Sequence, residues 1–348
     1  MSPLLLSGKV PPKSLVKAVF KYLGISDERI ILGPAIGEDA AIIKVKEKTL
    51  ALTTDPITGA TENIGWLSVH INANDIATRG VKPLWYLCCI LLPERKNEGL
   101  LKNIMKQIDK ASKELGIAVV GGHSEVTLGL RRPIVIGFMM GECEKGKYVT
   151  SSGAKVGDKI ILTKTAGIEG TAILANELNE FLKKKINPRI LKRAKGFIKK
   201  VSVVKDALVA MKAGGVSAIH DPTEGGVFSG LWELAKASRV GLIAREDRIP
   251  VSFETKTICD VLKLDPLKIM SSGALLITTK KEKSEEVLSA LKGNEVQASI
   301  IGEIVELKRG RKLMKRNGRA IEIKPCFRDE LYVALENYGK NKHEFLIY

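Results

Sequence analysis

Residues 37–55 read GEDAAIIKVKEKTLALTTD, and this stretch sets the architecture expected for the N-terminal half. Two runs rich in apolar and β-branched residues, 40–45 and 49–54, flank a charged segment at 46–48, which is typical of a β-hairpin. Asp39 precedes the first run and Asp55 follows the second. Because the open ends of an antiparallel pair lie together, the hairpin is expected to bring both carboxylates to the same end.

The sequence around this hairpin predicts alternating helices and strands. Asn63 stands where a helix cap is expected, and the apolar pattern after it continues to about Thr78, before Gly80 and Pro83. The other elements expected in this half are helices over 15–23 and 100–115 and strands over 84–92, 117–120 and 134–139.

A loop rich in Gly, Lys and Ser at 146–157 separates this half from a second α/β half. Expected helices lie at about 168–183, 189–200, 203–212, 227–237 and 283–292, and expected strands near 159–163, 217–220, 273–279 and 296–301. A basic tail, 308–348, contains one more helix between Pro325 and Gly339. The pattern predicts a mixed α/β (α+β) protein with domains at 1–148 and 155–307, followed by the tail.

The composition is that of a globular protein from a reducing compartment. The chain has 348 residues, of which 45% are apolar and 27% charged, enough to bury substantial cores. Cys88 and Cys89 are neighbours within an apolar run, so no disulfide framework is expected among the five cysteines. No secretory signal or membrane span is visible, and we expect a cytoplasmic protein. Two glutamines beside abundant Lys and Glu indicate a thermophilic source.

The formal net charge of +17 raises the possibility of a polyanionic partner. Residues 181–205 carry ten basic and no acidic side chains, and residues 308–348 carry eleven basic and five acidic ones, so the rest of the chain is nearly neutral. Aromatic residues are 5% of the chain and do not interleave with these lysines, so a nucleic-acid platform is not favoured. The two basic patches are better suited to solubility or to docking an acidic partner protein.

Common catalytic motifs are missing from the sequence. It has no Walker loop, no G-x-G-x-x-G after a strand, and no C-x-x-C, H-E-x-x-H or G-x-S-x-G. Aspartates in glycine-rich or strand-end settings remain, and carboxylates of this kind suit Mg²⁺. Each alone is more often a turn residue, but Asp75 lies within a helix close to its apolar face, where an unpaired carboxylate is costly.

Five segments in order carry a resemblance that covers roughly residues 10–307: GEDAA, TTDP, NDIATRGVKP, GGHSE and DPTEGG. They resemble the superfamily of aminoimidazole ribonucleotide synthetase, selenophosphate synthetase, thiamine-monophosphate kinase and the hydrogenase maturation protein HypE. The resemblance implies a two-domain PurM-like fold whose N-terminal domains pair into a β-barrel in a homodimer, with Mg-ATP bound in a cleft. It implies Mg²⁺ ligands at Asp39, Asp55, Asp75 and Asp221, and nucleotide contacts at Gly37, Thr54, Asn74, Gly121, Gly122, Ser124, Thr223, Gly225 and Gly226.

Residues 121–124 are expected to form a glycine-rich turn near the nucleotide, which the partner subunit could supply. The backbone amides of Gly121 and Gly122, or alternatively those of Gly225 and Gly226, could approach phosphate oxygens closely, because no Cβ obstructs them. Lys9 and His123 are the candidate catalytic residues, although a solvated lysine and a structural histidine explain them equally well.

HypE is the most similar branch, and its members dehydrate a thiocarboxamide on their own C-terminal cysteine. This sequence ends in EFLIY, so that reaction is not expected in cis, and Cys326 is a weak alternative acceptor. Glu224 stands where HypE has arginine, and His123 where it usually has aspartate. The leading hypothesis is an Mg-ATP-dependent enzyme that phosphorylates an amide, acid or thiocarboxamide oxygen. An ATP-binding scaffold without turnover is the second, and a nucleic-acid-binding protein the third.

Overall fold

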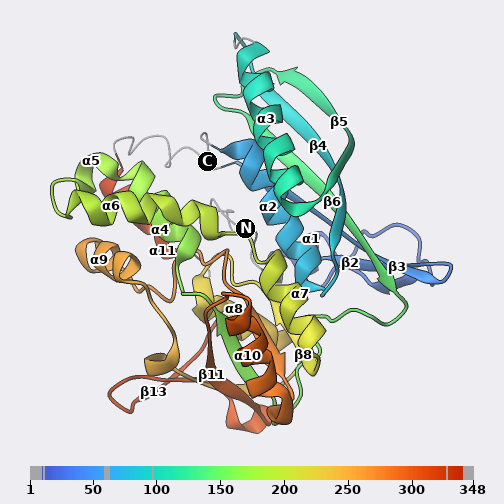
Figure 1. The fold of residues 1–348 in the computed structure, drawn as a ribbon, viewed down its shortest axis with the longest axis vertical. Coiled ribbons are helices and arrows are strands. Elements are labelled where there is room, and N and C mark those ends of the chain that lie inside the picture. Colours follow the sequence, from blue (N-terminus) through green and yellow to red (C-terminus); the bar gives the residue numbers. More distant parts are fainter. Residues whose placement is uncertain (1–9, 11, 59–62, 96–97, 327, 340–348) are drawn as a thin grey trace. The chain divides into compact units, whose positions relative to one another are not determined.

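The computed structural model describes residues 10, 12–58, 63–95, 98–326 and 328–339 (Figure 1). The chain divides into two compact units. The N-terminal unit comprises Asp27–Pro34 and Asp39–Tyr148, and the C-terminal unit comprises the described residues of Met1–Ser26, Ala35–Glu38 and Val149–Tyr348. Both units combine helices with a mixed β-sheet, which confirms the mixed α/β class.

A six-stranded sheet in the order β1-β2-β3-β6-β4-β5 forms the frame of the N-terminal unit. Its strands are β1 (Ile30–Leu32), β2 (Ala41–Val45), β3 (Lys48–Ile57), β4 (Pro83–Pro93), β5 (Ala118–Thr127) and β6 (Ile134–Glu144). Strands β2 and β3 pair antiparallel, with Ala41 opposite Leu52, so the predicted hairpin is confirmed. All other neighbours are antiparallel except β4 and β5, which run parallel.

Helices α2 (Ile64–Thr78) and α3 (Glu98–Leu115) pack side by side against this sheet (Figure 1). Ile76 of α2 and Ile104 and Ile108 of α3 are almost completely buried between them. Asn63 precedes α2 as predicted, but it has a left-handed φ of 60° and makes no side-chain cap. Helix α2 is therefore held by packing rather than by its first residue.

The C-terminal unit contains a seven-stranded sheet in the order β13-β12-β9-β11-β7-β10-β8. Its strands are β7 (Lys159–Thr163), β8 (Val216–His220), β9 (Gly241–Arg245), β10 (Leu276–Thr279), β11 (Ala298–Val305), β12 (Arg311–Met314) and β13 (Ala320–Glu322). The sequence did not predict β9, β12 or β13. The last two belong to the segment expected to be a tail, so part of that tail completes the sheet.

Helices surround this sheet in two groups. The α-helices of the unit are α1 (Pro12–Ala18), α4 (Ile168–Glu177), α5 (Asn179–Leu182), α6 (Pro188–Lys195), α7 (Val204–Ala213), α8 (Gly226–Ala237), α9 (Phe253–Leu262), α10 (Ser284–Gly293) and α11 (Glu330–Tyr338). Short 3₁₀ segments are η1 (Gly196–Lys200), η2 (Glu246–Arg248), η3 (Lys281–Lys283) and η4 (Leu307–Arg309). Helices α7, α8 and α10 contact the sheet, whereas α4, α6, α9 and α11 share a separate apolar cluster.

The basic run of residues 181–205 forms the outside of this helical cluster. Leu191 and Ala194 of α6 and Phe197 of η1 are buried, while Lys192 and Lys199 are exposed. The run is therefore amphipathic as predicted, although the α-helix ends at Lys195. Within the described part of the chain, no helix combines the length and the apolar character needed to cross a bilayer.

Candidate functional site

Three of the predicted metal ligands lie at one end of the hairpin in the N-terminal unit. Asp39 lies two residues before the start of β2, Asp55 lies in β3, and Asp75 lies in α2. The Thr53 hydroxyl donates a hydrogen bond to Asp75 Oδ2 at 2.7 Å and lies 3.1 Å from the carbonyl oxygen of Asp39. One hydroxyl thus ties the helix carboxylate to the hairpin and gives Asp75 a hydrogen-bond partner.

A buried arginine, which the sequence reading did not select, completes this group. The Arg79 side chain is 0% exposed, and its Nη2 donates to Asp39 Oδ2 at 3.0 Å. The same guanidinium donates to Thr78 Oγ1, whose hydroxyl donates to the carbonyl oxygen of Asp75. Arg79 lies four residues after Asp75 and therefore on the same face of the helix region, a spacing that could have identified it.

Asp55 is fixed through its main chain. Its backbone N–H donates to Asn72 Oδ1 at 2.9 Å, and its carbonyl oxygen accepts from Asn72 Nδ2 at 3.2 Å. The Thr54 hydroxyl donates to the carbonyl oxygen of Gly137 on β6 at 2.8 Å. Asn74 is completely buried in α2. The two hydrogen bonds between the main chain of Asp55 and the side-chain amide of Asn72 hold β3 against α2. The direction of the Asp55 side chain is therefore set by the geometry of the strand.

The donor set of this group suits Mg²⁺. Asp39, Asp55 and Asp75 offer oxygen atoms alone, which is the ligand chemistry that this hard cation prefers. Two unit charges of the same sign 4 Å apart repel by about 4 kcal/mol at an effective dielectric constant of 20. Arg79 offsets part of this repulsion at Asp39, and a bound cation would offset more.

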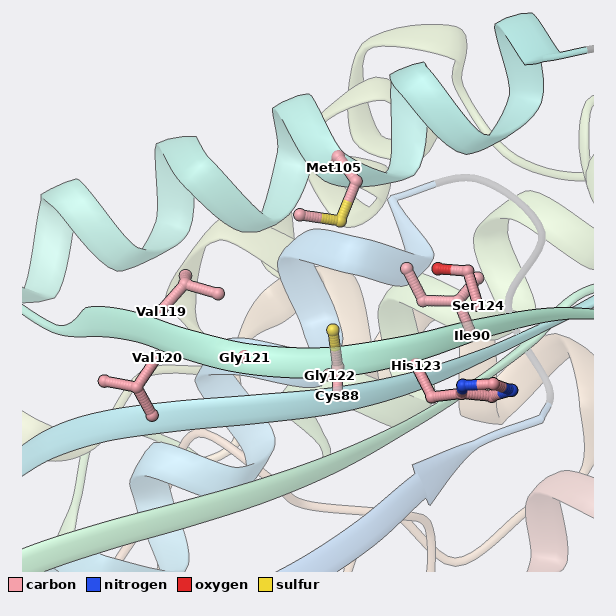
Figure 2. Close-up of a pocket in the computed structure, with 9 residues that line it drawn as sticks. All are labelled: Cys88, Ile90, Met105, Val119, Val120, Gly121, Gly122, His123 and Ser124. Carbon is pink, nitrogen blue, oxygen red and sulfur yellow. The ribbon is translucent and has the colours of Figure 1, made fainter.

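The predicted glycine-rich turn at 121–124 is wrong, because these residues continue strand β5. They line an open cavity of about 470 Å³ between β5 and α3, together with Cys88, Ile90, Met105, Val119 and Val120. Figure 2 shows Met105 and Ser124 on the helix side of the strand, whereas Val120 and His123 point away from α3. His123 is exposed, with its Nε2 3.5 Å from Glu125 Oε2. Gly122 packs so closely on β4 that a Cβ would lie 2.3 Å from the carbonyl oxygen of Cys88.

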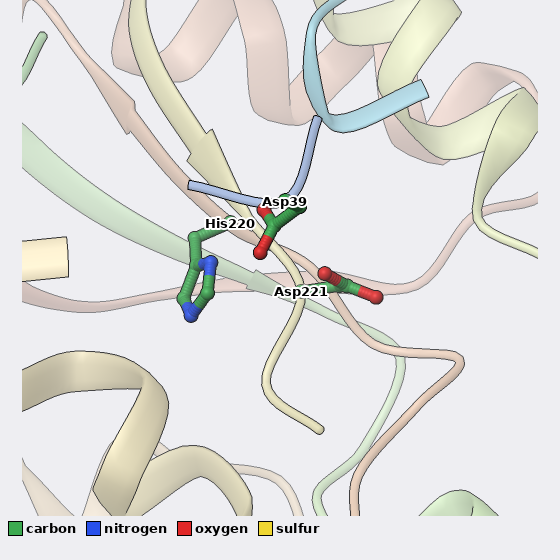
Figure 3. Close-up of side chains that lie close together, drawn as sticks. All are labelled: Asp39, His220 and Asp221. Atoms are coloured by element: carbon green, nitrogen blue, oxygen red, sulfur yellow. The ribbon is translucent and has the colours of Figure 1, made fainter. Parts of the chain in front are cut away.

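The fourth predicted metal ligand belongs to the C-terminal unit. His220 ends β8, and Asp221 follows it directly (Figure 3). Both residues are buried. His220 Nε2 lies 2.9 Å from Glu233 Oε2 of α8. Gly37, which belongs to this unit, packs on α8, where a Cβ would lie 3.2 Å from the carbonyl oxygen of Glu233. Within the C-terminal unit, Glu233 of α8 thus contacts His220 through its carboxylate and lies beside Gly37 through its main chain.

The amides of the DPTEGG turn are already used within the chain. Gly225 N donates to Asp329 Oδ2 at 2.6 Å, and Gly226 N donates to the carbonyl oxygen of Thr223 at 3.1 Å. Both residues have left-handed φ values, +75° and +62°. The expectation that these two amides point at phosphate oxygens is therefore wrong for this conformation. A nucleotide role for Thr223, Gly225 and Gly226 stays a prediction. Nucleotide contacts in this turn would have to be made by its side chains or by other main-chain atoms.

Two further candidates can be placed only in part. Lys9 lies outside the described residues. Cys326 is half-buried, and its thiol donates to the carbonyl oxygen of Arg328 at 3.0 Å. Burial raises the pKa of the Cys326 thiol, so the nucleophilic thiolate is disfavoured. Cys326 is a packed residue beside the turn rather than an activated acceptor.

Comparison with known families matches both units. A family model for the N-terminal domain of AIR synthase related protein matches residues 37–143, and the model for its C-terminal domain matches residues 155–315. These two ranges include Asp39, Asp55 and Asp75 in the first and Asp221 in the second.

Relatives of known sequence include hydrogenase maturation proteins. A hydrogenase expression/formation protein of Methanocaldococcus jannaschii is 30% identical over 308 residues, 85% of this chain and 88% of that protein. The carbamoyl dehydratase HypE of Cupriavidus necator is 32% identical over 252 residues, 70% of this chain and 68% of that protein. A crystal structure of HypE in complex with ATP has a TM-score of 0.68 at 20% identity, covering 92% of this chain and 96% of its own. At that identity the similarity concerns the fold alone.

Proposed function

Because the chain belongs to the AIR synthase related family, we propose that it is an Mg-ATP-dependent enzyme related to HypE. It would transfer the γ-phosphoryl group to an amide, acid or thiocarboxamide oxygen and so prepare that oxygen to leave as phosphate. The observation that carries the proposal is the buried group of Asp39, Asp75, Thr53 and Arg79, in which each carboxylate has a fixed partner. Phosphoryl transfer depends mainly on such positioning and on charge stabilisation.

The residues that would hold Mg²⁺ in the N-terminal unit are Asp39, Asp55 and Asp75, and Asp221 stays a candidate from the sequence. The bound ion would neutralise charge on the phosphates. The chain itself supplies orientation, because Arg79 fixes Asp39 and the Thr53 hydroxyl fixes Asp75. A carboxylate that is already oriented loses less conformational freedom when a ligand binds.

The acceptor in this proposal is a group on another molecule. Burial raises the pKa of Cys88, Cys143, Cys259 and Cys326, so these described thiols are poorly suited to carry a reactive carbamoyl or thiocarboxamide group. The carbamoyl dehydratase activity named for the Cupriavidus relative gives the class of substrate to test first. His123, exposed on β5, and Lys9 are the proposed catalytic side chains.

The edge of the N-terminal sheet supports a homodimer. Strand β5 is exposed along nearly its whole length, and it presents Val120 and Val126 at 51% and 62% exposure. An exposed apolar strand at a sheet edge is a template for pairing with another chain. We propose that a second copy covers β5, as in the barrel expected for this family, and that the protein works in the cytoplasm. The basic patches at 181–205 and 308–348 would then be free to dock an acidic maturation protein.

Isothermal titration with ATP in the presence of Mg²⁺ tests the proposal. Asp75→Asn keeps the shape of the side chain but removes its charge, so affinity for Mg-ATP should fall at least about tenfold, as expected for a lost charge-assisted contact. Asp109→Asn is the matched control, because Asp109 lies on the exposed face of α3 and pairs only with Lys113 among the described residues. Equal binding by wild type and Asp75→Asn would contradict the metal assignment.

Phosphate release distinguishes the enzyme from a scaffold. With amides, carboxylic acids and thiocarboxamides offered in turn, at least one acceptor should raise phosphate release above the background of ATP alone. Tight ATP binding without release in the presence of any acceptor would favour the scaffold.

A further inference from the structure

The C-terminal segment 328–338 holds the turn that follows Asp221. Asp329 Oδ2 accepts the hydrogen bond from Gly225 N at 2.6 Å, and the Tyr332 hydroxyl donates to Glu224 Oε1 at 3.2 Å. Asp329 is only 1% exposed. Two consecutive residues of the turn are thus bound by a segment that lies 104 residues later in the chain.

Asp329 also caps the last helix. Its Oδ1 accepts from Leu331 N at 2.7 Å, which fixes the first turn of α11. Burial raises the pKa of Asp329 to about 7, although hydrogen bonds from the backbone amides of Leu331, Gly225 and Met270 favour its ionised form. Above neutral pH, a single carboxylate therefore joins α11, the turn and the loop that contains Met270.

Helix α11, which follows Asp329, is held by packing and by a hydrogen bond at its start. Leu331, Ala334 and Leu335 of α11 belong to the apolar cluster shared with α4, α6 and α9. The Glu330 carboxylate accepts from Asp265 N at 2.5 Å, so the start of the helix is tied to the loop before Leu267. We call Asp329 and Tyr332, which bind the turn, the C-terminal clamp. Because α11 packs in the helical cluster, the clamp holds the turn at a fixed position relative to that cluster.

The turn is closed from its other side by the loop 267–271. Ser271 N donates to the carbonyl oxygen of Thr223 at 3.2 Å, and Phe228 N donates to that of Leu267 at 2.9 Å. A Cβ on Gly225 would lie 2.8 Å from the Cβ of Cys326 and 2.7 Å from that of Ser229. The main chain of the turn therefore fits closely between the C-terminal segment and α8, and has little space in which to relax.

We propose that Asp329 is a positioning residue of the nucleotide site: by binding Gly225 N, it fixes the turn that carries Asp221 and Thr223. This inference rests on the proposed function, because it assigns those two side chains to Mg-ATP. The hydrogen bond has an ionisable acceptor, and losing such a bond changes an equilibrium constant by about tenfold or more.

The test compares wild type with Asp329→Ser in the full chain at pH 8, where the carboxylate is ionised. Serine is a good helix cap and can still accept from Leu331 N, but its shorter side chain cannot reach Gly225 N as well. We expect the Kd for ATP with Mg²⁺ to rise about tenfold, and amide hydrogen exchange at Gly225 to accelerate. Exchange at Leu331 should remain close to the wild-type value, whereas the Tm should fall, because Gly225 N loses its buried acceptor.

Asn187→Ala is the matched control for loss of a helix cap. Asn187 caps α6 in the same unit by accepting from Arg189 N at 2.9 Å. This variant should lower the Tm and leave the Kd for Mg-ATP unchanged. Unchanged nucleotide affinity in Asp329→Ser, or equal weakening in Asn187→Ala, would overturn the positioning role alone. Wild-type protein that does not bind Mg-ATP would overturn the proposed function, and this inference with it.

Discussion

The two units hold their candidate aspartates in different ways. In the N-terminal unit, side chains from one hairpin and one helix bind each other, and the group from Asp39 to Arg79 spans a short part of the sequence. In the C-terminal unit, the turn after Asp221 is held through main-chain amides and by a residue 104 positions away from Gly225. The stability of the local group is expected to depend on the charges of its side chains. The position of the C-terminal turn is expected to depend on how closely its main chain packs.

The largest expected effect is the loss of Arg79 from the local group. Arg79→Ala leaves the Asp39 carboxylate without its buried guanidinium partner, and removing one member of a buried ion pair costs about 4 kcal/mol. Chemical unfolding of the full chain should show this loss in the free energy of unfolding.

Arg29→Ala is the control, because Arg29 forms a bidentate pair with Asp27 on the surface of the same unit. Exposed pairs contribute little, so its unfolding midpoint should match the wild type. Equal effects of the two substitutions would mean that burial of the Arg79 pair is not what stabilises the group.

The backbone fit of the C-terminal turn is tested by Gly226→Ala. Gly226 has a left-handed φ of +62°, and a Cβ there would lie 2.5 Å from the carbonyl oxygen of Ile269. Conformational strain and overpacking together should cost about 3 kcal/mol in the free energy of unfolding. Gly318, with a φ of +81° and open space around its Cβ position, is the control, and Gly318→Ala should cost about 1 kcal/mol. Similar losses of stability in Gly226→Ala and Gly318→Ala would show that backbone strain, and not close packing, accounts for the cost at Gly226.

Acid should act on the N-terminal unit through His70 of α2. Burial lowers the pKa of His70 from 6.5 to about 4, against the opposing effect of Glu114. The unfolded chain therefore binds a proton more readily, so stability is complete above pH 6.5 and is lost as pH falls toward 4. The loss should be about 3 kcal/mol, measured by chemical unfolding across this range. His70→Gln should have a shallower dependence, and an unchanged slope would assign the acid sensitivity elsewhere.

The smallest expected effect concerns the hydroxyl of Tyr332. Tyr332→Phe removes the hydrogen bond to Glu224 and keeps the ring, so it should cost about 1 kcal/mol in the free energy of unfolding. Tyr338→Phe in the same helix is the control, because the ring of Tyr338 packs on Phe181 and that contact is retained. If both variants unfold alike, the clamp depends on Asp329 alone.

Local patterns in the sequence predicted much of the fold. The charged segment 46–48 between two apolar runs predicted the β2–β3 hairpin, and apolar periodicity predicted α2 and α3. Strands β12 and β13 were missed because they are short and lie among many charged residues, such as Arg311 and Lys312, which resemble a solvated tail. The pairing of β12 with β9 is a long-range contact that no local pattern reports, and β13 joins the sheet through β12.

The sequence predicted those residues of the candidate site that lie in short sequence motifs. The aspartates were identified from their motifs, but Arg79 was overlooked because a lysine or arginine near a helix end is usually solvated. The glycines at 121–122 suggested a turn, whereas Gly122 serves close backbone packing between β4 and β5. Asp329 could not be found from the sequence, because its partner Gly225 is brought to it only by the folded helical cluster.

The hydrogen bond between Gly225 and Asp329 also orders events during synthesis. At about 5–20 residues per second, the ribosome needs roughly 5–20 s to add the residues that separate them. The N-terminal hairpin and α2 can associate long before this, since the strands with which they pair or pack, β1, β3 and β6, all end by Glu144. A chain truncated before Asp329 would therefore contain the group from Asp39 to Arg79 but lack the acceptor of Gly225 N, so the turn after Asp221 is fixed late in folding.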